Sequence, residues 1–338
     1  MEQRQPQEQL MHLLEGMMRS QALYTVAKLD IADRLGDEVK CISQLAQETH
    51  THETSLYRLL RAMASIGIFA QEQPGVFTNT EISSLLRSDH PASLRDGARL
   101  FGSKAFWQSW GSLDHSIKTG EQAFNHVFHE TIWSYFASHP GEAEQFNRAM
   151  TSITQYEDVA VPQAYDFSSK TIADIGGGHG RLLTNILTSC SDARGILFDT
   201  ATVIKQAKEH FSPELRERAQ LIAGCFFASI PTGADVYILK NILHNWSDEQ
   251  CVTILQNCRR AMGPDSKVLV VERIMPETND SDQAEIFLVD LIMLAMFGGH
   301  ERSCGQMEHL FANSGLRLTR LIATGAHGIH IVEGVAAD

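Results

Sequence analysis

A glycine-rich turn at residues 176–180 is the segment whose residue types and spacing point most directly to chemistry. Residues 173–180 read ADIGGGHG and lie between an apolar run and a helical pattern. Glycines at such a point permit a tight turn, and they allow a ligand to approach the backbone and the helix N-terminus closely. Asp199 ends the next apolar run, about twenty residues further on. A carboxylate at that place accepts hydrogen bonds from both ribose hydroxyls of a nucleoside.

The spacing of the glycines indicates which nucleotide the turn can hold. A dinucleotide fingerprint, G-x-G-x-x-G, counted from Gly176 would require glycine at position 181, where the chain has Arg181. The shorter spacing of Gly176, Gly178 and Gly180 favours a nucleoside without a pyrophosphate. S-adenosyl-L-methionine is an example of such a nucleoside.

The elements that would position this turn alternate between strand and helix from residue 170 onward. Strands that cross over through helices form a parallel sheet with helices on both faces. The pattern therefore predicts an α/β, Rossmann-like doubly wound domain over residues 166–338. The expected strands are residues 171–175, 195–198, 219–222, 235–239 and 267–271, and the expected helices are residues 182–187, 203–210 and 248–261.

Residues 1–100 predict a separate, mostly helical module. Four apolar residues recur at the spacing of one helix face, namely Leu56, Leu59, Leu60 and Met63. Thr51 or Thr54 is a candidate cap for this helix. A short hairpin with strands at residues 66–71 and 76–78 is expected to follow. Three helices followed by a small hairpin are typical of a winged helix.

The charge of the chain argues against a DNA-binding role for this module. The 338 residues carry a net charge of −13, and residues 1–100 hold ten Lys and Arg against thirteen Asp and Glu. The helix that would read DNA offers only Arg58 and Arg61, beside Glu53, whereas a DNA reader needs a basic face. Association with another protein chain is the better prediction. It is favoured by the apolar residues of the first helix, Leu10, Leu13, Leu14, Met17 and Met18.

Residues 101–165 are helical and rich in aromatic residues, and we expect them to connect the two parts and contribute to a substrate pocket. No apolar run approaches the roughly 18 residues that a membrane helix requires. The polar segment at residues 1–9 does not resemble a signal peptide. These features predict a cytoplasmic protein that does not associate with membranes.

Histidine and cysteine form no pattern that is typical of a metal site. His126 and His129 have ligand-like spacing, but no third ligand stands at a comparable distance. The six cysteines include no C-x-x-C pair, so neither a zinc site nor a disulfide framework is indicated. We predict that the chain binds no metal.

Three further segments, together with the glycine turn, carry a family resemblance. Residues 240–251 read KNILHNWSDEQC, residues 271–276 read VERIMP, and residues 297–302 read FGGHER. With these segments nearly the whole chain resembles the class I O-methyltransferases of the caffeic acid, isoflavone and acetylserotonin type, which include bacterial small-molecule members. The resemblance implies a homodimer formed by the N-terminal domain. It also implies S-adenosylmethionine-dependent methylation of a hydroxyl on a small aromatic or polyketide-like metabolite.

The resemblance also implies roles for individual residues. His244 matches the general base of the family, and Glu272 and Glu301 match its two acidic neighbours. The cofactor contacts that the resemblance implies are Asp174, Gly176, Gly178, Asp199, Gly224, Cys225, Phe226 and Lys240. The acceptor contacts that it implies are Phe146, Met150 and Asn245.

A histidine base agrees with the chemistry of the acceptor. A phenol has a pKa of about 10, so its ionisation at neutral pH costs about 4 kcal/mol. A histidine within hydrogen-bond reach can take the proton as the methyl group moves, which avoids much of that cost. A carboxylate on the other ring nitrogen fixes the tautomer and stabilises the imidazolium.

Three positions depart from the family pattern. Relatives carry G-D-M at the adenine edge where this chain has Gly224, Cys225 and Phe226. A thiol accepts hydrogen bonds weakly, and the loss of such a bond costs about 1 kcal/mol. Asn245 replaces a common Asp after the base, which removes a negative charge beside His244. Ile153 stands where some plant members have a polar residue that faces the substrate, which points to a different acceptor.

Other functions stay open on the sequence. Some relatives use this scaffold for hydroxylation, decarboxylation or pericyclic reactions without methyl transfer. Methylation of carbon or nitrogen is a smaller variation on the predicted reaction. A ligand-responsive regulator that binds DNA through the winged helix is a third class, which the charge of residues 1–100 disfavours.

Overall fold

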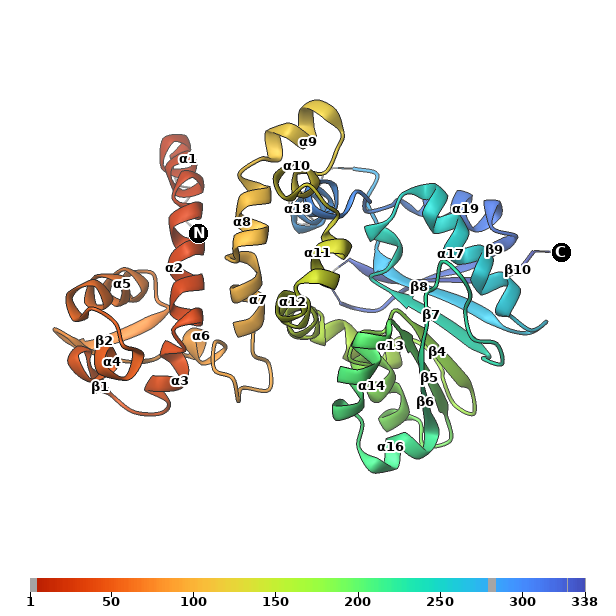
Figure 1. Cartoon of the computed structure of the whole chain (residues 1–338), viewed down its shortest axis with the longest axis horizontal. Helices are drawn as coiled ribbons and strands as arrows, with labels where there is room; N and C mark the ends of the chain where they lie inside the picture. The colour runs from red at the N-terminus through yellow and green to blue at the C-terminus, as the bar shows by residue number, and fades with distance from the viewer. Residues whose placement is uncertain (1–4, 279–283, 327, 338) are drawn as a thin grey trace. The chain divides into compact units, whose positions relative to one another are not determined.

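The computed structural model describes residues 5–278, 284–326 and 328–337 (Figure 1). The chain forms two compact units. The first contains Met1–Gln108 and Phe136–Ile153, and the second contains Ser109–Tyr135 and Thr154–Asp338. Residues 101–165, which the sequence assigns to a connector, are therefore shared between the two units.

The first unit is mainly helical. Two helices continue from one unit into the other: α8 (Lys104–Trp110) and α11 (Ile132–Ser138). The remaining helices of this unit are α1 (Pro6–Leu14), α2 (Gly16–Lys28), α3 (Ile31–Leu35), α4 (Ile42–Thr49), α5 (Glu53–Ser65), α6 (Glu81–Ser84), α7 (Arg95–Phe101) and α12 (Pro140–Ile153).

A small antiparallel sheet completes the winged-helix pattern of the first unit. Its strands β1 (Lys40–Cys41), β2 (Phe69–Gln73) and β3 (Val76–Asn79) lie in the order β1-β3-β2. The hairpin predicted from the sequence is confirmed. The two-residue strand β1 was not predicted, since so short a segment has no alternation to detect.

Helix α5 presents the predicted apolar stripe to the core of this unit. Leu56, Leu60 and Met63 are buried there. The predicted cap is wrong. The N-cap residue is His52, which makes no capping hydrogen bond with its side chain in the described part of the chain. The Thr51 hydroxyl instead lies 2.9 Å from the hydroxyl of Thr49.

The second unit contains a seven-stranded sheet in the order β6-β5-β4-β7-β8-β10-β9. Its five predicted strands are confirmed, and they pair in parallel. The last two strands close the sheet by antiparallel pairing and were not predicted. The strands are β4 (Thr171–Ile175), β5 (Arg194–Asp199), β6 (Ala219–Ala223), β7 (Val236–Lys240), β8 (Lys267–Arg273), β9 (Leu316–Ala323) and β10 (Ile329–Ala336).

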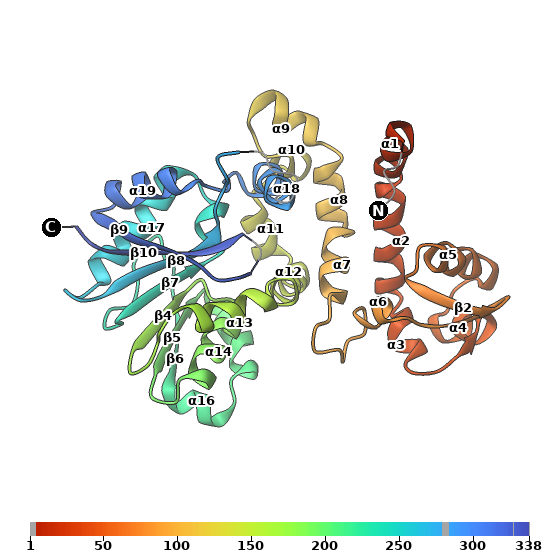
Figure 2. The same cartoon turned by 180° about the vertical axis from the view of Figure 1, so that it is seen from behind.

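Helices cover both faces of this sheet (Figure 1, Figure 2). The α-helices that lie wholly in the second unit are α9 (Leu113–Thr119), α10 (Ala123–Phe128), α13 (Gln155–Ala164), α14 (Arg181–Ser189), α15 (Ala201–Ala207), α16 (Pro213–Arg218), α17 (Asp248–Ala261), α18 (Ala284–Ile292) and α19 (Cys304–Asn313). Short 3-10 turns are η1 (Lys208–His210) and η2 (Leu243–Asn245), and a π-helical turn is η4 (Met293–Phe297).

Strand alternation builds two cores from one sheet. Along β7, Val236 and Ile238 pack with helices α13, α14 and α15 on one face. Tyr237 and Leu239 pack with α17 and α19 on the other. Successive side chains of a strand point to opposite faces. A strand with four consecutive buried apolar side chains, as at residues 236–239, therefore requires helices on both sides of the sheet. The predicted doubly wound α/β fold is therefore confirmed.

None of the helices in the described ranges combines the length and the apolar character that crossing a membrane requires.

Candidate active site

The glycine turn connects β4 to α14 in a conformation that only glycine adopts readily. Gly176, Gly178 and Gly180 have φ angles of 70°, 58° and 78°. A Cβ atom at Gly176 would lie 2.5 Å from the Ile242 side chain, and one at Gly180 would lie 2.5 Å from Phe211. At Gly178, by contrast, a Cβ would meet no described atom within 4 Å. The backbone at Gly178 therefore offers open space beside the N-terminus of α14.

Asp199 lies across this opening at the end of β5. Its carboxylate accepts hydrogen bonds from the backbone N–H groups of Gly178, at 3.0 Å, and Thr200, at 2.7 Å. Burial raises the pKa of Asp199, although these two backbone donors oppose the rise. The predicted pair of glycine turn and acidic residue is thus brought together by direct hydrogen bonding.

Asp174, at the end of β4, is a second buried carboxyl group beneath the turn. It is 2% exposed, and burial raises its pKa to about 7. Its Oδ2 atom has no hydrogen-bond partner among the residues that the structure describes. A buried polar atom of this kind ordinarily has a partner, so this atom is a natural contact for a ligand.

Lys240 ends β7 and faces the first turn of α13. Its ammonium group donates to the carboxylate of Asp158 and, at 2.9 Å, to the hydroxyl of Thr154. Asp158 and its neighbour Glu157 are almost fully buried. Glu157 accepts from the Asn241 amide at 2.7 Å and from Arg273 at 3.3 Å.

Glu157 and Asp158 were missed by the sequence analysis. On the chain they look like ordinary acidic residues in the first turn of a helix. Their partners Lys240 and Asn241 lie more than 80 positions away. Only the fold shows that the cation expected at the cofactor is already neutralised by a buried carboxylate.

His244 lies in η2, the turn that follows β7, and is 7% exposed. Its ring Nδ1–H donates to Glu301 Oε1 at 2.8 Å, because an ionised carboxylate can only accept. Its backbone N–H donates to Glu272 Oε1 at 3.0 Å. The two predicted acidic neighbours therefore differ, since Glu301 orients the ring whereas Glu272 fixes the backbone.

The electrostatics of this group favour a charged imidazole. Burial alone lowers the pKa of His244, but the charge and hydrogen bond of Glu301, with a smaller contribution from Glu272, outweigh it and raise the pKa above its ordinary value. Burial raises the pKa of Glu272. Because Glu301 fixes the proton on Nδ1, the Nε2 atom of neutral His244 is left as the proton acceptor.

A group of packed aromatic rings includes Trp246, which lies two residues after His244. The ring of Trp246 packs edge-on against Phe227 at 4.8 Å and against Phe226 at 6.0 Å. On the other side Trp246 stacks on Trp133, with ring centroids 5.3 Å apart, and Trp133 lies 5.6 Å from Phe297. The sequence analysis named Phe226 as a cofactor contact but did not name Trp246, although Trp246 lies two residues after His244.

The remaining predicted residues occupy different places. A Cβ at Gly224 would lie 2.4 Å from the Phe198 ring, and Cys225 beside it is exposed. The Asn245 amide donates to the Asn241 carbonyl at 3.0 Å, so it holds the turn. Phe146 and Met150 lie on α12 of the first unit, and their contact with an acceptor stays a prediction.

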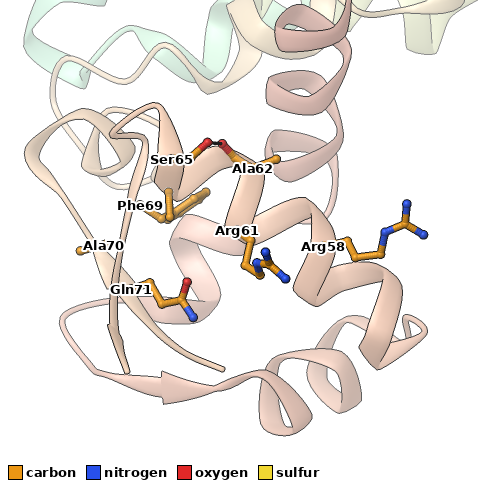
Figure 3. A pocket seen from close by; sticks show the side chains of 8 residues that line it. Arg58, Arg61, Ala62, Ser65, Phe69, Ala70 and Gln71 are labelled. Carbon is orange, nitrogen blue, oxygen red and sulfur yellow. Dashed lines mark hydrogen bonds between the residues drawn. The ribbon is translucent and has the colours of Figure 1, made fainter. Parts of the chain in front are cut away.

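A hollow of about 720 Å³ lies on the first unit, between α5 and β2 (Figure 3). Arg58, Arg61 and Gln71 line it beside small apolar residues. None of the predicted site residues is among those that line it. This surface includes both arginines of the helix that would read DNA in a winged-helix protein.

The fold and the glycine turn define a class I S-adenosylmethionine-dependent methyltransferase. Residues 110–317 match the profile of the O-methyltransferase domain, and residues 11–89 match that of the O-methyltransferase dimerisation domain. The chain belongs to the O-methyltransferase family. The predicted resemblance is therefore confirmed, and the chain is an O-methyltransferase of secondary metabolism.

Individual relatives match along nearly their whole length. The phenazine O-methyltransferase PhzM of Lysobacter antibioticus is 40% identical over 96% of this chain and 94% of its own. The mitomycin biosynthesis 6-O-methyltransferase of Streptomyces lavendulae is 35% identical over 95% and 92%. The crystal structure of LaPhzM superposes with a TM-score of 0.95 at 39% identity, covering 98% of this chain and 100% of that one.

S-adenosylmethionine is the cofactor of this family, as predicted, and similar structures hold it or its demethylated product. One is NcsB1, an O-methyltransferase from neocarzinostatin biosynthesis, with a TM-score of 0.80 at 30% identity over 94% of this chain and 96% of that one. The residues present here fit the group. Gly178 leaves open space, Asp199 borders it, and the Oδ2 atom of Asp174 lacks a described partner.

Proposed function

We propose that this enzyme methylates a hydroxyl group of a small aromatic acceptor, with His244 as the general base. The observation that carries the proposal is the buried pair of His244 and Glu301, with 2.8 Å between the ring nitrogen and the carboxylate oxygen. An imidazole that is held by a carboxylate on one nitrogen presents its other nitrogen to a proton donor.

The protein's part in the reaction is to bind, orient and move one proton. His244 Nε2 takes the proton of the acceptor hydroxyl as the oxygen becomes a nucleophile. The resulting imidazolium is stabilised by Glu301, whose hydrogen bond then joins two opposite charges. Because Glu301 raises the pKa of His244, less free energy separates the base from a phenol, at about 1.4 kcal/mol for each pKa unit.

We assign the cofactor contacts to the chain's own residues as follows. When bound, S-adenosylmethionine supplies a methyl group on a sulfonium, which leaves as a neutral thioether. Asp199 is the acceptor for the ribose hydroxyls, Gly178 provides the close approach of the backbone, and Asp174 lies beneath the turn. Lys240, already paired with Asp158, contributes little net charge to the site.

An aromatic acceptor is supported by the rings beside the base. Trp246, Trp133 and Phe297 form a continuous wall in the unit that carries His244. Flat rings favour stacking with a flat acceptor. The names of the relatives point the same way, since they include a phenazine and a 3-amino-4-hydroxybenzoate O-methyltransferase. We further propose Phe146, Met150 and Asn245 as acceptor contacts.

We also propose that the dimerisation domain forms a homodimer. Its first two helices expose apolar side chains that a single chain leaves in water, of which Leu13 is the most open at 74% exposure. Large exposed apolar patches mark interaction surfaces. The other members of this patch are Leu10, Met11, Leu14, Met17 and Met18.

Methyl transfer to hydroxylated phenazines, naphthoates and aminobenzoates, with His244→Ala as the comparison, tests the proposed reaction. We expect S-adenosylhomocysteine and an O-methylated product from the parent, and a loss of roughly 10²-fold or more in His244→Ala. A His244→Ala variant as active as the parent would refute the role of the base.

Product analysis separates the second candidate, nitrogen methylation. It is favoured by one relative that is 32% identical over 90% of this chain, the 8-amino-8-demethylriboflavin N,N-dimethyltransferase of Streptomyces davaonensis. An aminophenol acceptor offers both atoms at once, and NMR of the product identifies which atom carries the methyl group. Turnover of an acceptor without S-adenosylhomocysteine would instead indicate a non-methylating reaction.

A further inference from the structure

A buried arginine follows directly after Glu301 and is not used by the proposed reaction. Arg302 is 0% exposed and is one of the largest fully buried side chains of the described chain. Burial of an arginine is costly unless every part of its guanidinium is hydrogen-bonded. Its partners therefore indicate what it does.

Those partners lie on both sides of His244. Arg302 Nη1 donates to the Leu243 carbonyl at 2.9 Å, and Nη2 donates to the Trp246 carbonyl at 2.8 Å. Nε and Nη2 also donate to Asp248 Oδ1, at 3.0 and 2.8 Å. One guanidinium thus bridges the residue before His244, the residue two places after it, and the first residue of α17.

The segment that carries Arg302 is itself fixed against the same turn. A Cβ at Gly299 would lie 2.1 Å from the His244 carbonyl oxygen, so the two backbones are in close contact. The Arg302 carbonyl accepts from the Met275 backbone N–H at 2.9 Å, just beyond the strand β8 that carries Glu272. Glu301 and Arg302 therefore share one backbone segment, and a backbone hydrogen bond joins it to the segment that follows Glu272.

We propose that Arg302 is a positioning residue for the base: it holds the turn from Leu243 to Trp246 so that the His244 ring stays against Glu301. This inference rests on the proposed function, in which His244 takes the proton. The hydrogen bonds of Arg302 do not go to the ring, which donates to Glu301; Arg302 acts through the carbonyls of Leu243 and Trp246. The four-residue segment 299–302 then supplies close packing at Gly299, the ring partner at Glu301 and the backbone contacts of Arg302.

Only arginine suits this place. Its planar group presents five donors in fixed directions, so it can reach two carbonyls and a carboxylate together, whereas the lysine ammonium is a compact group on a flexible chain. The Leu243 carbonyl also accepts from the Trp246 backbone N–H at 3.0 Å. Cys251 Sγ is a further donor, at 3.2 Å from the Leu243 carbonyl oxygen and 3.6 Å from that of Trp246. A thiol is a weak donor, so it cannot replace the guanidinium.

The primary test is Arg302→Lys in the full-length enzyme, with Arg218→Lys as the matched control. Arg218 likewise donates to three backbone carbonyls, those of Leu187, Cys190 and Ala193, but it does so at the end of α14. Both variants lose a carbonyl clamp. Only one loses the clamp on the turn that carries His244.

We expect Arg302→Lys to lower kcat on the order of 10²-fold, as a misplaced catalytic group does. The Kd for S-adenosylmethionine, measured by calorimetry, should stay within about twofold of the parent. The charged groups that act on the His244 ring are Glu301, Glu272 and Arg273. Since Glu301 raises the pKa of His244, a looser contact should move the acid limb of the kcat profile to lower pH. Arg218→Lys should change none of these values.

A folded Arg302→Lys enzyme with the parental kcat and acid limb, measured beside an inactive His244→Ala, overturns the positioning role alone. A fully active His244→Ala overturns the proposed function instead, so the two failures are distinguishable. If Arg302→Lys does not fold, Asp248→Asn is the second variant. Asp248 accepts from Arg302 and its side chain is 57% exposed, so its substitution disturbs the fold less. It should reduce kcat severalfold with the same shift of the limb, and parental values would again overturn the inference.

Discussion

Replacement of Glu301 by glutamine changes a single charge at the proposed base and leaves the shape of the side chain unchanged. The amide oxygen can still accept from His244 Nδ1, across the 2.8 Å that separates the two groups now. The tautomer should therefore persist. What is lost is the negative charge that stabilises the imidazolium in the step that removes the acceptor proton.

The magnitude follows from the change in hydrogen-bond type. A bond to a charged partner contributes about 1.5–3 kcal/mol, against about 1 kcal/mol for a neutral pair. A loss of roughly 0.5–2 kcal/mol lowers kcat by roughly 2- to 30-fold. Because Glu301 raises the pKa of His244 and the base acts only when deprotonated, its removal should shift the acid limb of the kcat profile to lower pH.

The assay is the initial rate of S-adenosylhomocysteine formation at saturating acceptor, measured across the pH range for parent and Glu301→Gln. Glu333→Gln is the matched control, since Glu333 is also buried but binds Lys267 and Arg320 on the strands β8 and β9. An acid limb that stays in place in Glu301→Gln, or moves to higher pH, would refute the assigned role of Glu301.

Three other substitutions test separate parts of the structure. Gly178→Ala should weaken binding of S-adenosylmethionine in calorimetry, because the added methyl group would fill the open space that we assign to the cofactor. An unchanged Kd would remove Gly178 from the cofactor site. Gly233→Ala, at a φ of 89°, is the control for backbone strain, since Gly178 also has a positive φ, of 58°. If position 225 accepts a hydrogen bond from adenine, Cys225→Asp should tighten cofactor binding by about fivefold, or roughly 1 kcal/mol. An unchanged affinity would show that position 225 does not contact adenine. Although burial raises the pKa of Glu333, hydrogen bonds from Arg320 and Lys267 hold it well below its usual range. Glu333→Gln should therefore lose roughly 1–2 kcal/mol of stability at pH 7, and the deficit should shrink as pH falls below about 4.5. Urea midpoints at pH 7 and at a pH below about 4.5 measure this loss of stability. A loss that does not change with pH would contradict the charge argument.

The elements that depend only on residues close together in the sequence were predictable. The strand that ends at Ile175, the glycine turn and the helix of residues 248–261 follow from apolar periodicity and local turn chemistry. Strands β9 and β10 were missed because their antiparallel closure of the sheet depends on pairing with β8, about 60 residues earlier.

The sequence predicted that His244 has two acidic neighbours, and the structure brings Glu272 and Glu301 to it, but it did not predict what each carboxylate contacts. Glu272 and Glu301 look equivalent on the chain, yet one binds a backbone N–H and the other binds the ring of His244. Glu157 and Asp158 gave no signal, since their value depends on partners that folding brings near. Long-range ion pairing of this kind leaves no periodic pattern in a single sequence.

Lys240 and His244 lie four positions apart, at the end of β7 and in the turn that follows it. The proposed cofactor contact Lys240 and the proposed base His244 therefore share one covalent segment, and their spacing does not depend on the aromatic residues Trp133 and Phe297. Under the proposed function, substitutions at Trp133 or Phe297 would change the acceptor while the groups that carry out the methyl transfer keep their positions. A chimaera that exchanges residues 109–135 with a relative should accordingly acquire that relative's preference and keep its own chemistry.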